Sequence, residues 1–329
     1  MDEAIDLVHR TDRAGVLARL VRVVGDFDLA EDSLADAFAA AVTAWRRDGV
    51  PDNPAGWLVT TARRKAIDRL RRAASSERRH REWGELAIAW TASNRQEPIV
   101  DDRLRLMFTC CHPALAPEAR IALTLRTLGG LSTAEVARAF LLPEATLAQR
   151  LVRAKRKIRT AGIPYRVPTA AELPERLDGV LAVIYLIFNE GYLAATGDEL
   201  VRLDLCDEAV RLALLLVELL PEETEPLGLA ALLHLQRSRL PARTDPHGHP
   251  VTLEDQDRSL WDRADIERGV DLLTEALAIG RPGPYQLKAA MGAVHGLAPD
   301  AASTDWPAIV SLYDTLLGWE PTPIVQLNR

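Results

Sequence analysis

The stretch GLSTAEVARAFLLPEATLAQRLVRAKRKIR, residues 130–159, decides how this chain is interpreted. It predicts two short helices joined by a tight turn. Ser132 and Glu135 stand three residues apart at the first helix start, the spacing of a capping box, in which two side chains satisfy otherwise unpaired backbone N–H groups. Pro143 breaks the first helix, and its fixed backbone angle suits the start of the second.

The second of these helices has one apolar side and one basic side. Its apolar residues recur at helical spacing and are Leu147, Leu151, Ala154 and Ile158. Its cations are Arg150, Arg153, Lys155, Arg156, Lys157 and Arg159. A helix-turn-helix with a basic second helix is suited to the major groove of DNA. Duplex DNA is therefore the first partner that the sequence predicts.

The composition indicates an all-α protein with no membrane partner. The chain has 329 residues, enough for two or three domains, and 48% of them are apolar while only 5% are aromatic. Abundant Ala, Leu and Arg favour helices over sheets. No apolar run approaches the roughly 20 residues of a membrane span. Three cysteines, two of them adjacent, supply no disulfide framework. We therefore expect a cytoplasmic protein.

Charge is divided unevenly along the chain. The net charge of −7 by itself argues against a nucleic-acid partner. Residues 1–159, however, carry 27 Lys and Arg against 21 Asp and Glu, whereas residues 160–329 carry 13 against 26. A basic first half joined to an acidic second half is itself an indication of nucleic-acid binding.

A second basic helix is predicted about 80 residues upstream, over residues 54–72. Residues 63–82 hold nine Lys and Arg and three Asp and Glu. The residues expected on its buried side are Trp57, Leu58, Ala62, Ala66, Ile67 and Leu70. The alternative interpretation is an ordinary solvated helix face. Two basic helices with a polar linker between them nevertheless suit two separated contacts on one duplex.

These two segments together resemble one known family. Residues 29–45, LAEDSLADAFAAAVTAW, and residues 53–72, NPAGWLVTTARRKAIDRLRR, look like region 2 of an extracytoplasmic-function sigma factor. Residues 130–159 resemble region 4 of the same family. The chain departs from the family pattern at Ala35 and Asp36, where the family has Gln and Glu. Its second half is similar to the sigma subgroup that has a helical, tetratricopeptide-like C-terminal extension.

The resemblance implies an all-α alternative sigma factor, which binds core RNA polymerase and directs it to promoter DNA. It implies region 2 at residues 1–73, a linker at 74–100, region 4 at 101–160 and a regulatory extension at 165–329. It implies no enzyme activity, no catalytic residue, no cofactor and no metal. A regulatory protein at the C-terminal extension is a further expected partner, and this acidic extension is also expected to mask the basic surfaces.

The resemblance further implies roles for single residues. The residues implied at core polymerase are Asp32, Asp36, Phe38 and Trp45. The residues implied at the −10 element are Asn53, Trp57, Arg63, Arg64, Lys65 and Arg71. The residues implied at the −35 element are Thr146, Gln149, Arg150, Val152, Arg153, Lys155 and Arg156. We expect Phe38, Trp45 and Trp57 to be mainly core residues, which leaves the carboxylates as the better polymerase contacts.

Within the −35 set, Gln149, Val152 and Arg153 match the base-facing positions of the family. Arg pairs with guanine and Gln with adenine, and each such pair is worth roughly 1–3 kcal/mol of discrimination. Arg150, Lys155 and Arg156 are expected at phosphates, which fix register. Ala148 stands where many members carry a basic or polar side chain, so readout of that base is an open question.

Three other clusters admit a chemical interpretation. Cys110, Cys111 and His112 invite a metal site, but adjacent cysteines on a helix diverge, and buried small side chains are the expected reading. Asp245, His247 and His249 form a second metal candidate in a Pro- and Gly-rich loop. Residues 189–192, NEGY, are either a ligand-binding corner or a helix end with a glycine stop.

Two other classes of protein are alternatives to a sigma factor. A one-site transcriptional activator with a ligand-sensing helical domain would bind duplex DNA without polymerase, but the basic helix at residues 54–72 argues against it. An enzyme would use Glu190, His234 or the histidine loop. No nucleophile, base and orienting group stand together in the sequence in support of an enzyme.

Overall fold

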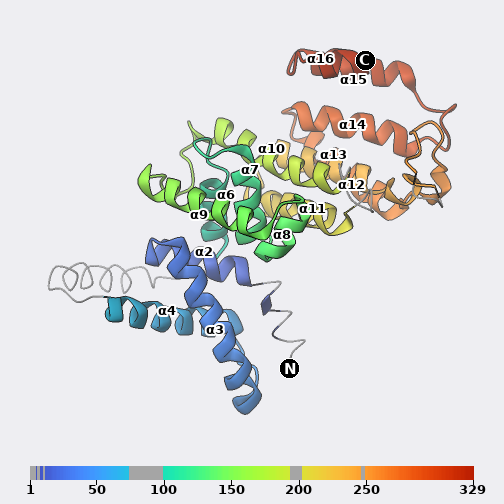
Figure 1. Ribbon diagram of the computed structural model, residues 1–329. Coiled ribbons are helices and arrows are strands. Elements are labelled where there is room, and N and C mark those ends of the chain that lie inside the picture. Colours follow the sequence, from blue (N-terminus) through green and yellow to red (C-terminus); the bar gives the residue numbers. More distant parts are fainter. Residues whose placement is uncertain (1–4, 6–7, 10–11, 74–98, 193–201, 246–248) are drawn as a thin grey trace. The chain divides into compact units, whose positions relative to one another are not determined.

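The computed structural model describes residues 5, 8–9, 12–73, 99–192, 202–245 and 249–329 (Figure 1). The described residues form helices and no strand, with one isolated antiparallel bridge between Thr244 and Pro250. The expected all-α class is therefore confirmed. The chain divides into two compact units, residues 1–137 with 143–177 and residues 138–142 with 178–329. The predicted linker at 74–100 lies outside the described residues as far as residue 98.

The first unit begins with three helices, α2 (Arg13–Val24), α3 (Phe27–Asp48) and α4 (Pro54–Ala73). Gly25 ends α2 with φ of +69°, a conformation that favours glycine. One residue later, the Asp26 carboxylate accepts a hydrogen bond from the Leu29 N–H at 2.9 Å and caps α3. The short connection makes α2 and α3 neighbours. The helix predicted over residues 54–72 is confirmed as α4.

An aromatic pair joins α3 to α4. Trp45 is 1% exposed, and its ring meets that of Trp57 edge-on at 5.5 Å. Burial of a tryptophan in this way contributes on the order of 3–5 kcal/mol to stability, the usual cost of truncating one to alanine. Trp57 itself is half-buried. The expectation of a core position is thus confirmed for Trp45, while Trp57 and Phe38, also half-buried, keep part of their surface in solvent.

Four further helices of the first unit are α6 (Ile99–Cys110), α7 (Pro117–Thr127), α8 (Thr133–Ala139) and α9 (Glu144–Thr160). Cys110 and Cys111 are buried where α6 ends, with their sulfurs 3.3 and 3.5 Å from the hydroxyls of Thr127 and Thr124. Burial raises the pKa of the Cys111 thiol to about 11. Both cysteines are small core residues, as expected.

The second unit is a series of packed helices. They are α10 (Leu173–Tyr192), α11 (Leu203–Leu219), α12 (Thr224–Arg237), α13 (Arg263–Ala278), α14 (Pro284–Leu297), α15 (Trp306–Leu317) and α16 (Pro323–Asn328). Each helix from α11 to α16 packs on its neighbour in the chain, and α12 also packs on α14. Helices α12 and α13 pack closely at Gly269, where a Cβ atom would lie 2.6 Å from the Leu235 side chain.

The prediction of a glycine stop at residues 189–192 is wrong. Gly191 lies within α10, which continues to Tyr192. A Cβ atom on Gly191 would lie 2.8 Å from the Arg202 carbonyl oxygen and 2.9 Å from the Cys206 amide nitrogen. Glycine is needed there because the chain that begins α11 passes against α10.

A polar segment, residues 238–262, lies between α12 and α13. Two short 3₁₀ helices, η1 (Leu240–Ala242) and η2 (Arg258–Leu260), shape it. The amide of Asp262 donates to the Ser238 carbonyl at 2.8 Å and closes the insert at its base. His249 is exposed and pairs with Asp245 at 3.1 Å, whereas His247 lies outside the described residues. In the described part of the chain no cluster of His, Cys, Asp and Glu suits a metal ion, and no helix is long and apolar enough to cross a membrane.

Candidate nucleic-acid interface

The helix-turn-helix forms from local signals, as the sequence predicts. The Ser132 amide donates to the Glu135 carboxylate at 2.7 Å, and the Glu135 amide donates to the Ser132 hydroxyl at 3.1 Å. This pair of bonds is the expected capping box at the start of α8. In the turn, Leu141 has φ of +50°. Pro143 then caps α9, and its carbonyl accepts from the Thr146 amide at 2.9 Å.

Helix α9 separates its apolar and polar side chains cleanly. The predicted apolar residues Leu147, Leu151, Ala154 and Ile158 are all buried. The opposite face is exposed and carries Thr146, Gln149, Val152, Arg153 and Arg156. Val152 keeps 58% of its surface in solvent, although it is a large apolar residue. Five of the seven residues predicted for the −35 element thus share one accessible helix face, and Arg150 is half-buried at its edge.

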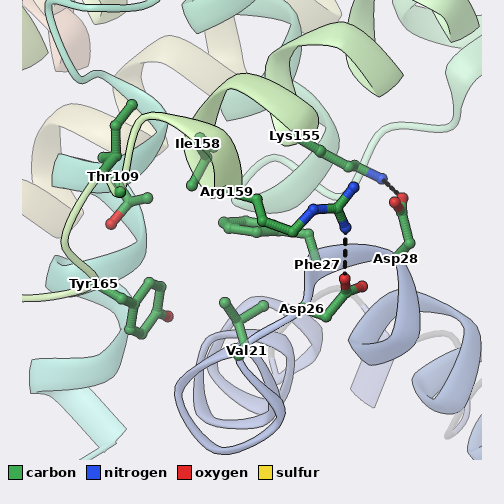
Figure 2. Close-up of a pocket in the computed structure, with 12 residues that line it drawn as sticks. Val21, Asp26, Phe27, Asp28, Thr109, Lys155, Ile158, Arg159 and Tyr165 are labelled. Carbon is green, nitrogen blue, oxygen red and sulfur yellow. Dashed lines mark hydrogen bonds and ion pairs between the residues drawn. The ribbon is translucent and has the colours of Figure 1, made fainter.

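Lys155 occupies a different environment from the other −35 residues. Its ammonium lies 2.9 Å from the Asp28 carboxylate and 2.5 Å from that of Glu31, and only 11% of its side chain is exposed. One turn further along α9, Arg159 pairs with Asp26 at 2.9 Å. Figure 2 shows these two cations reaching from α9 to the start of α3. Two cations at the end of α9 are therefore paired with three carboxylates at the start of α3.

The protonated form of Lys155 is favoured by these neighbours. Burial by itself lowers the pKa of the ammonium, but the charges of Glu31 and Asp28 and their hydrogen bonds outweigh burial. The net result is a pKa above the ordinary value of 10.5. Lys155 is thus fully charged at neutral pH in this arrangement.

Further contacts surround this docked end of α9. The Tyr165 hydroxyl donates to the Ala18 carbonyl at 2.8 Å, and its ring meets that of Phe27 edge-on at 6.5 Å. Arg13 donates to the Arg126 carbonyl at 3.1 Å. A cavity of about 280 Å³ lies between Phe27, Ile158 and Tyr165 (Figure 2). The contact of α2 and α3 with α9 is therefore partly polar and imperfectly packed.

The predicted −10 residues lie along α4 and its start. Asn53 caps α4, because its side-chain oxygen accepts a hydrogen bond from the Gly56 amide at 2.8 Å. Arg64 and Arg71 are exposed, while Arg63 and Lys65 are half-buried. Burial and the nearby Arg64 lower the pKa of Arg63. Trp57 presents the uncovered part of its ring at the start of the same helix.

The predicted polymerase-contacting carboxylates lie on α3 and pair with α4. Arg69 bridges Asp32 at 2.6 Å and Asp36 at 2.8 Å. Asp32 nevertheless keeps 65% of its side chain exposed and Asp36 keeps 40%. Trp45, in contrast, is buried and has no surface to offer a partner.

Sequence reasoning missed four residues at this interface: Asp26, Asp28, Glu31 and Tyr165. The acidic start of α3 holds three of them, Asp26, Asp28 and Glu31. Its partners on α9 stand 124 to 133 residues away, and no local pattern predicts a pairing over that separation. The enzyme alternative gains nothing from the structure, since His234 is buried against Asp265 at 2.8 Å, which in turn pairs with Arg237.

Comparison with known proteins identifies the chain's parts. Residues 9–76 match sigma-70 region 2, residues 105–158 match sigma-70 region 4, and residues 176–277 match a family of unknown function, DUF6596. An uncharacterized protein of Rhizobium meliloti is 44% identical over 99% of this chain and 78% of its own length. No solved structure gives a significant match.

Two named relatives are sigma factors. The probable extracytoplasmic-function RNA polymerase sigma factor SigI of Mycobacterium tuberculosis is 25% identical over 57% of this chain and 68% of its own length. The corresponding factor SigK of Mycolicibacterium vanbaalenii is 26% identical over 47% of this chain and 81% of its own. With regions 2 and 4 in order and a DUF6596 domain after them, the chain belongs to the sigma-70 family as an alternative sigma factor of the extracytoplasmic-function type, which directs transcription initiation.

Proposed function

We propose that the exposed face of α9 reads the −35 element of a promoter. The observation that carries this proposal is the exposure of Gln149, Val152 and Arg153 above a fully buried apolar face. Gln149 and Arg153 suit adenine and guanine, and Val152 offers an apolar contact to a thymine methyl group. Thr146, Arg150 and Arg156 would position the helix on phosphates, joined by Lys155 once it leaves its carboxylates.

Helix α4 is proposed to meet the −10 element. Arg63, Arg64, Lys65 and Arg71 supply phosphate contacts, and the Asn53 amide group is placed at the helix start. The partly uncovered ring of Trp57 suits stacking on an unpaired base, which is worth roughly 1–3 kcal/mol. Such a base becomes available when the duplex is opened, at a cost of a few kcal/mol for unstacking.

Core polymerase is proposed to bind the exposed side of α3. Asp32 and Asp36 are the main candidates because their carboxylates remain accessible beside Arg69. The half-buried Phe38 is an accessory contact. Trp45, the fourth residue of the predicted set, is assigned to packing instead. The domain limits proposed are 1–73, 74–100, 101–160 and 165–329, in a protein that works in the cytoplasm.

The contact between α9 and α3 is proposed to open before both promoter elements are bound. A unit of about 170 residues is about 40 Å across. The −10 and −35 elements are about 25 base pairs apart, or about 85 Å along B-form DNA. A unit with α9 docked on α3 does not span that distance. Opening would release Lys155 and Arg159 for phosphates, so DNA competes with Asp26, Asp28 and Glu31 for the same cations.

The acidic second unit is proposed to be regulatory. The charge imbalance of residues 160–329 favours contact with a basic surface, either on a partner protein, on polymerase or on the DNA-binding regions themselves. Removal of residues 178–329 should then raise promoter affinity if this unit masks the basic helices. An unchanged affinity would argue for a partner elsewhere.

In vitro transcription tests the proposal as a whole. Purified bacterial core RNA polymerase is incubated with genomic fragments of the source organism, with and without the protein, and transcript starts are sequenced. We expect a set of starts that depends on the protein and shares two upstream sequence elements. Specific binding to duplex DNA without polymerase, and no new transcript start with it, would favour a one-site activator instead.

A further inference from the structure

A groove of about 670 Å³ runs along the second unit between α12, α14, α15 and α16. Its volume is that of a typical small-molecule site, about 300–1,000 Å³. Apolar side chains form much of its wall, among them Leu253, Met291, Ile309 and Val310. Lys288, Arg239 and His295 contribute polar groups. The groove lies wholly within one unit, so its geometry does not depend on the first.

The cations of this groove differ in how they are neutralised. Lys288 pairs with Glu320 at 2.8 Å, and Arg329 pairs with Asp314 at 2.5 Å. In the described part of the chain Arg239 has no carboxylate within ion-pair distance, although it is half-buried. Its Nε atom is shielded from solvent and has no hydrogen-bond partner there. A partly desolvated guanidinium without an anion beside it raises the free energy of the folded protein. An anion bound at Arg239 would offset this cost.

Other groups around Arg239 add to the positive potential. The centroid of the Trp261 ring lies 6.0 Å from the Arg239 guanidinium and 4.9 Å from that of Arg258. The hydrogen-bond donors of Arg258 are used within the protein. They donate to the His295 and Ala298 carbonyls at the end of α14 and to the Thr304 hydroxyl. Among the described residues the Arg239 guanidinium has no such acceptor, so it is the one of the two that is available to a ligand.

His295 provides a second unsatisfied group in the same groove. Its Nδ1 atom is shielded from solvent and has no hydrogen-bond partner among the described residues. The ring packs edge-on against Trp306 at 5.4 Å. Burial, together with the charges of Arg239 and Arg258, lowers the pKa of His295 to about 4. A neutral imidazole protonated at Nδ1 would donate one hydrogen bond to an acceptor placed beside Arg239.

We infer that this groove binds a small organic anion, whose carboxylate or phosphate head lies at Arg239 and His295 and whose apolar body lies along Met291, Ile309 and Val310. The guanidinium fork matches either head in a bidentate geometry. The half-exposed Trp306 stands at the groove with an aromatic surface for the ligand body. This inference rests on the second unit alone and stands apart from the proposed promoter contacts.

The test uses two fluorescent probes that differ by one anionic group. These are 8-anilinonaphthalene-1-sulfonate and its uncharged counterpart N-phenyl-1-naphthylamine, each titrated into the full chain. We expect saturable binding of the sulfonate, weakened at least tenfold by Arg239→Gln, with binding of the uncharged probe changed less than twofold. Arg268→Gln removes a charge from an exposed position of α13 outside the groove and should leave both titrations unchanged.

Two further arms keep the result decisive. Val310→Glu adds a negative charge at an exposed position of the groove wall, and it should weaken sulfonate binding selectively even if Arg239→Gln fails to fold. Displacement of the sulfonate by benzoate but not by inorganic phosphate marks a carboxylate site. Displacement by inorganic phosphate but not by benzoate marks a phosphate site. Equal effects of Arg239→Gln and Arg268→Gln, no saturable sulfonate binding, or no competition by either anion would overturn the inference.

Discussion

The two basic helices, α4 and α9, both pair with carboxylates of α3, but with different parts of it. Asp32 and Asp36, in the middle of α3, pair with Arg69 of α4 inside region 2. Asp28 and Glu31, in its first turns, pair with Lys155 of region 4, and Asp26 just before them pairs with Arg159. The first set holds neighbouring helices of one region together. The second set occupies cations that α9, as the proposed DNA-reading helix, would place on phosphates, and so it links two regions that we propose to separate on the promoter.

The largest effect is expected from Arg153→Ala on the exposed face of α9. Loss of a bidentate contact to guanine should cost about 1–3 kcal/mol, or roughly tenfold or more in promoter affinity, and should relax specificity at one base position. Fluorescence anisotropy of the polymerase complex on promoters substituted at each −35 base measures both quantities. Arg156→Ala, at a proposed phosphate contact, should weaken all sequences alike. If Arg153→Ala also weakened binding to all promoter sequences equally, Arg153 would not be a base-reading residue of α9.

The next effect separates the two sets of carboxylates. Asp28→Asn combined with Glu31→Gln removes the partners of Lys155, and we expect the free chain to bind −35 DNA about threefold to tenfold more tightly, up to about 1.4 kcal/mol. Electrophoretic mobility shift at fixed salt measures the gain. The matched control, Asp32→Asn combined with Asp36→Asn, removes the partners of Arg69. Equal gains in both double variants would show that net charge, and not the docked contact, controls binding.

Alkaline pH should affect the two helices differently. The pKa of Lys155 lies above its ordinary value of 10.5 in the folded chain, so its stabilising contribution is complete below about 10.5 and declines as pH rises through the folded value. The Arg69 guanidinium keeps its charge there, because hydrogen bonds to Asp36 and Asp32 outweigh burial and raise its pKa above its ordinary value. Between pH 7 and 10 the docked contact should persist, and as pH rises through the folded pKa of Lys155 it should weaken while region 2 stays folded. Small-angle scattering follows the docked contact between α9 and α3, and circular dichroism follows the folding of region 2. Opening of the contact already at pH 8 would refute the role given to Lys155.

The smallest effect is expected from Arg69→Ala. Its two partners are well exposed, and exposed ion pairs contribute about 0–1 kcal/mol each. We expect urea unfolding of the full chain to change by less than about 1 kcal/mol. A loss several times larger would mean that the pairing of α3 with α4 depends on this arginine more than on the Trp45 and Trp57 contact.

Local signals made much of the fold predictable. The capping box at Ser132 and Glu135 and the apolar series from Leu147 to Ile158 are short-range patterns, and each formed the helix it indicated. Residues whose role depends on distant partners were not predictable. The docking of Lys155 on Asp28 and Glu31 crosses more than 120 residues, and the close approach at Gly191 depends on where α11 passes α10. The groove around Arg239 likewise combines helices far apart in the chain.

A distance measurement between regions 2 and 4 tests the central claim most directly. Thr43 on α3 and Thr160 at the end of α9 are exposed, and Cys110, Cys111 and Cys206 are buried, so Thr43→Cys with Thr160→Cys permits selective fluorescent labelling. In the free full chain we predict an energy-transfer distance within about 40 Å, the size of one compact unit. With core polymerase and promoter DNA bound we predict a distance beyond about 60 Å. A distance that stays short in the promoter complex, or that is already long in the free chain, would contradict the account.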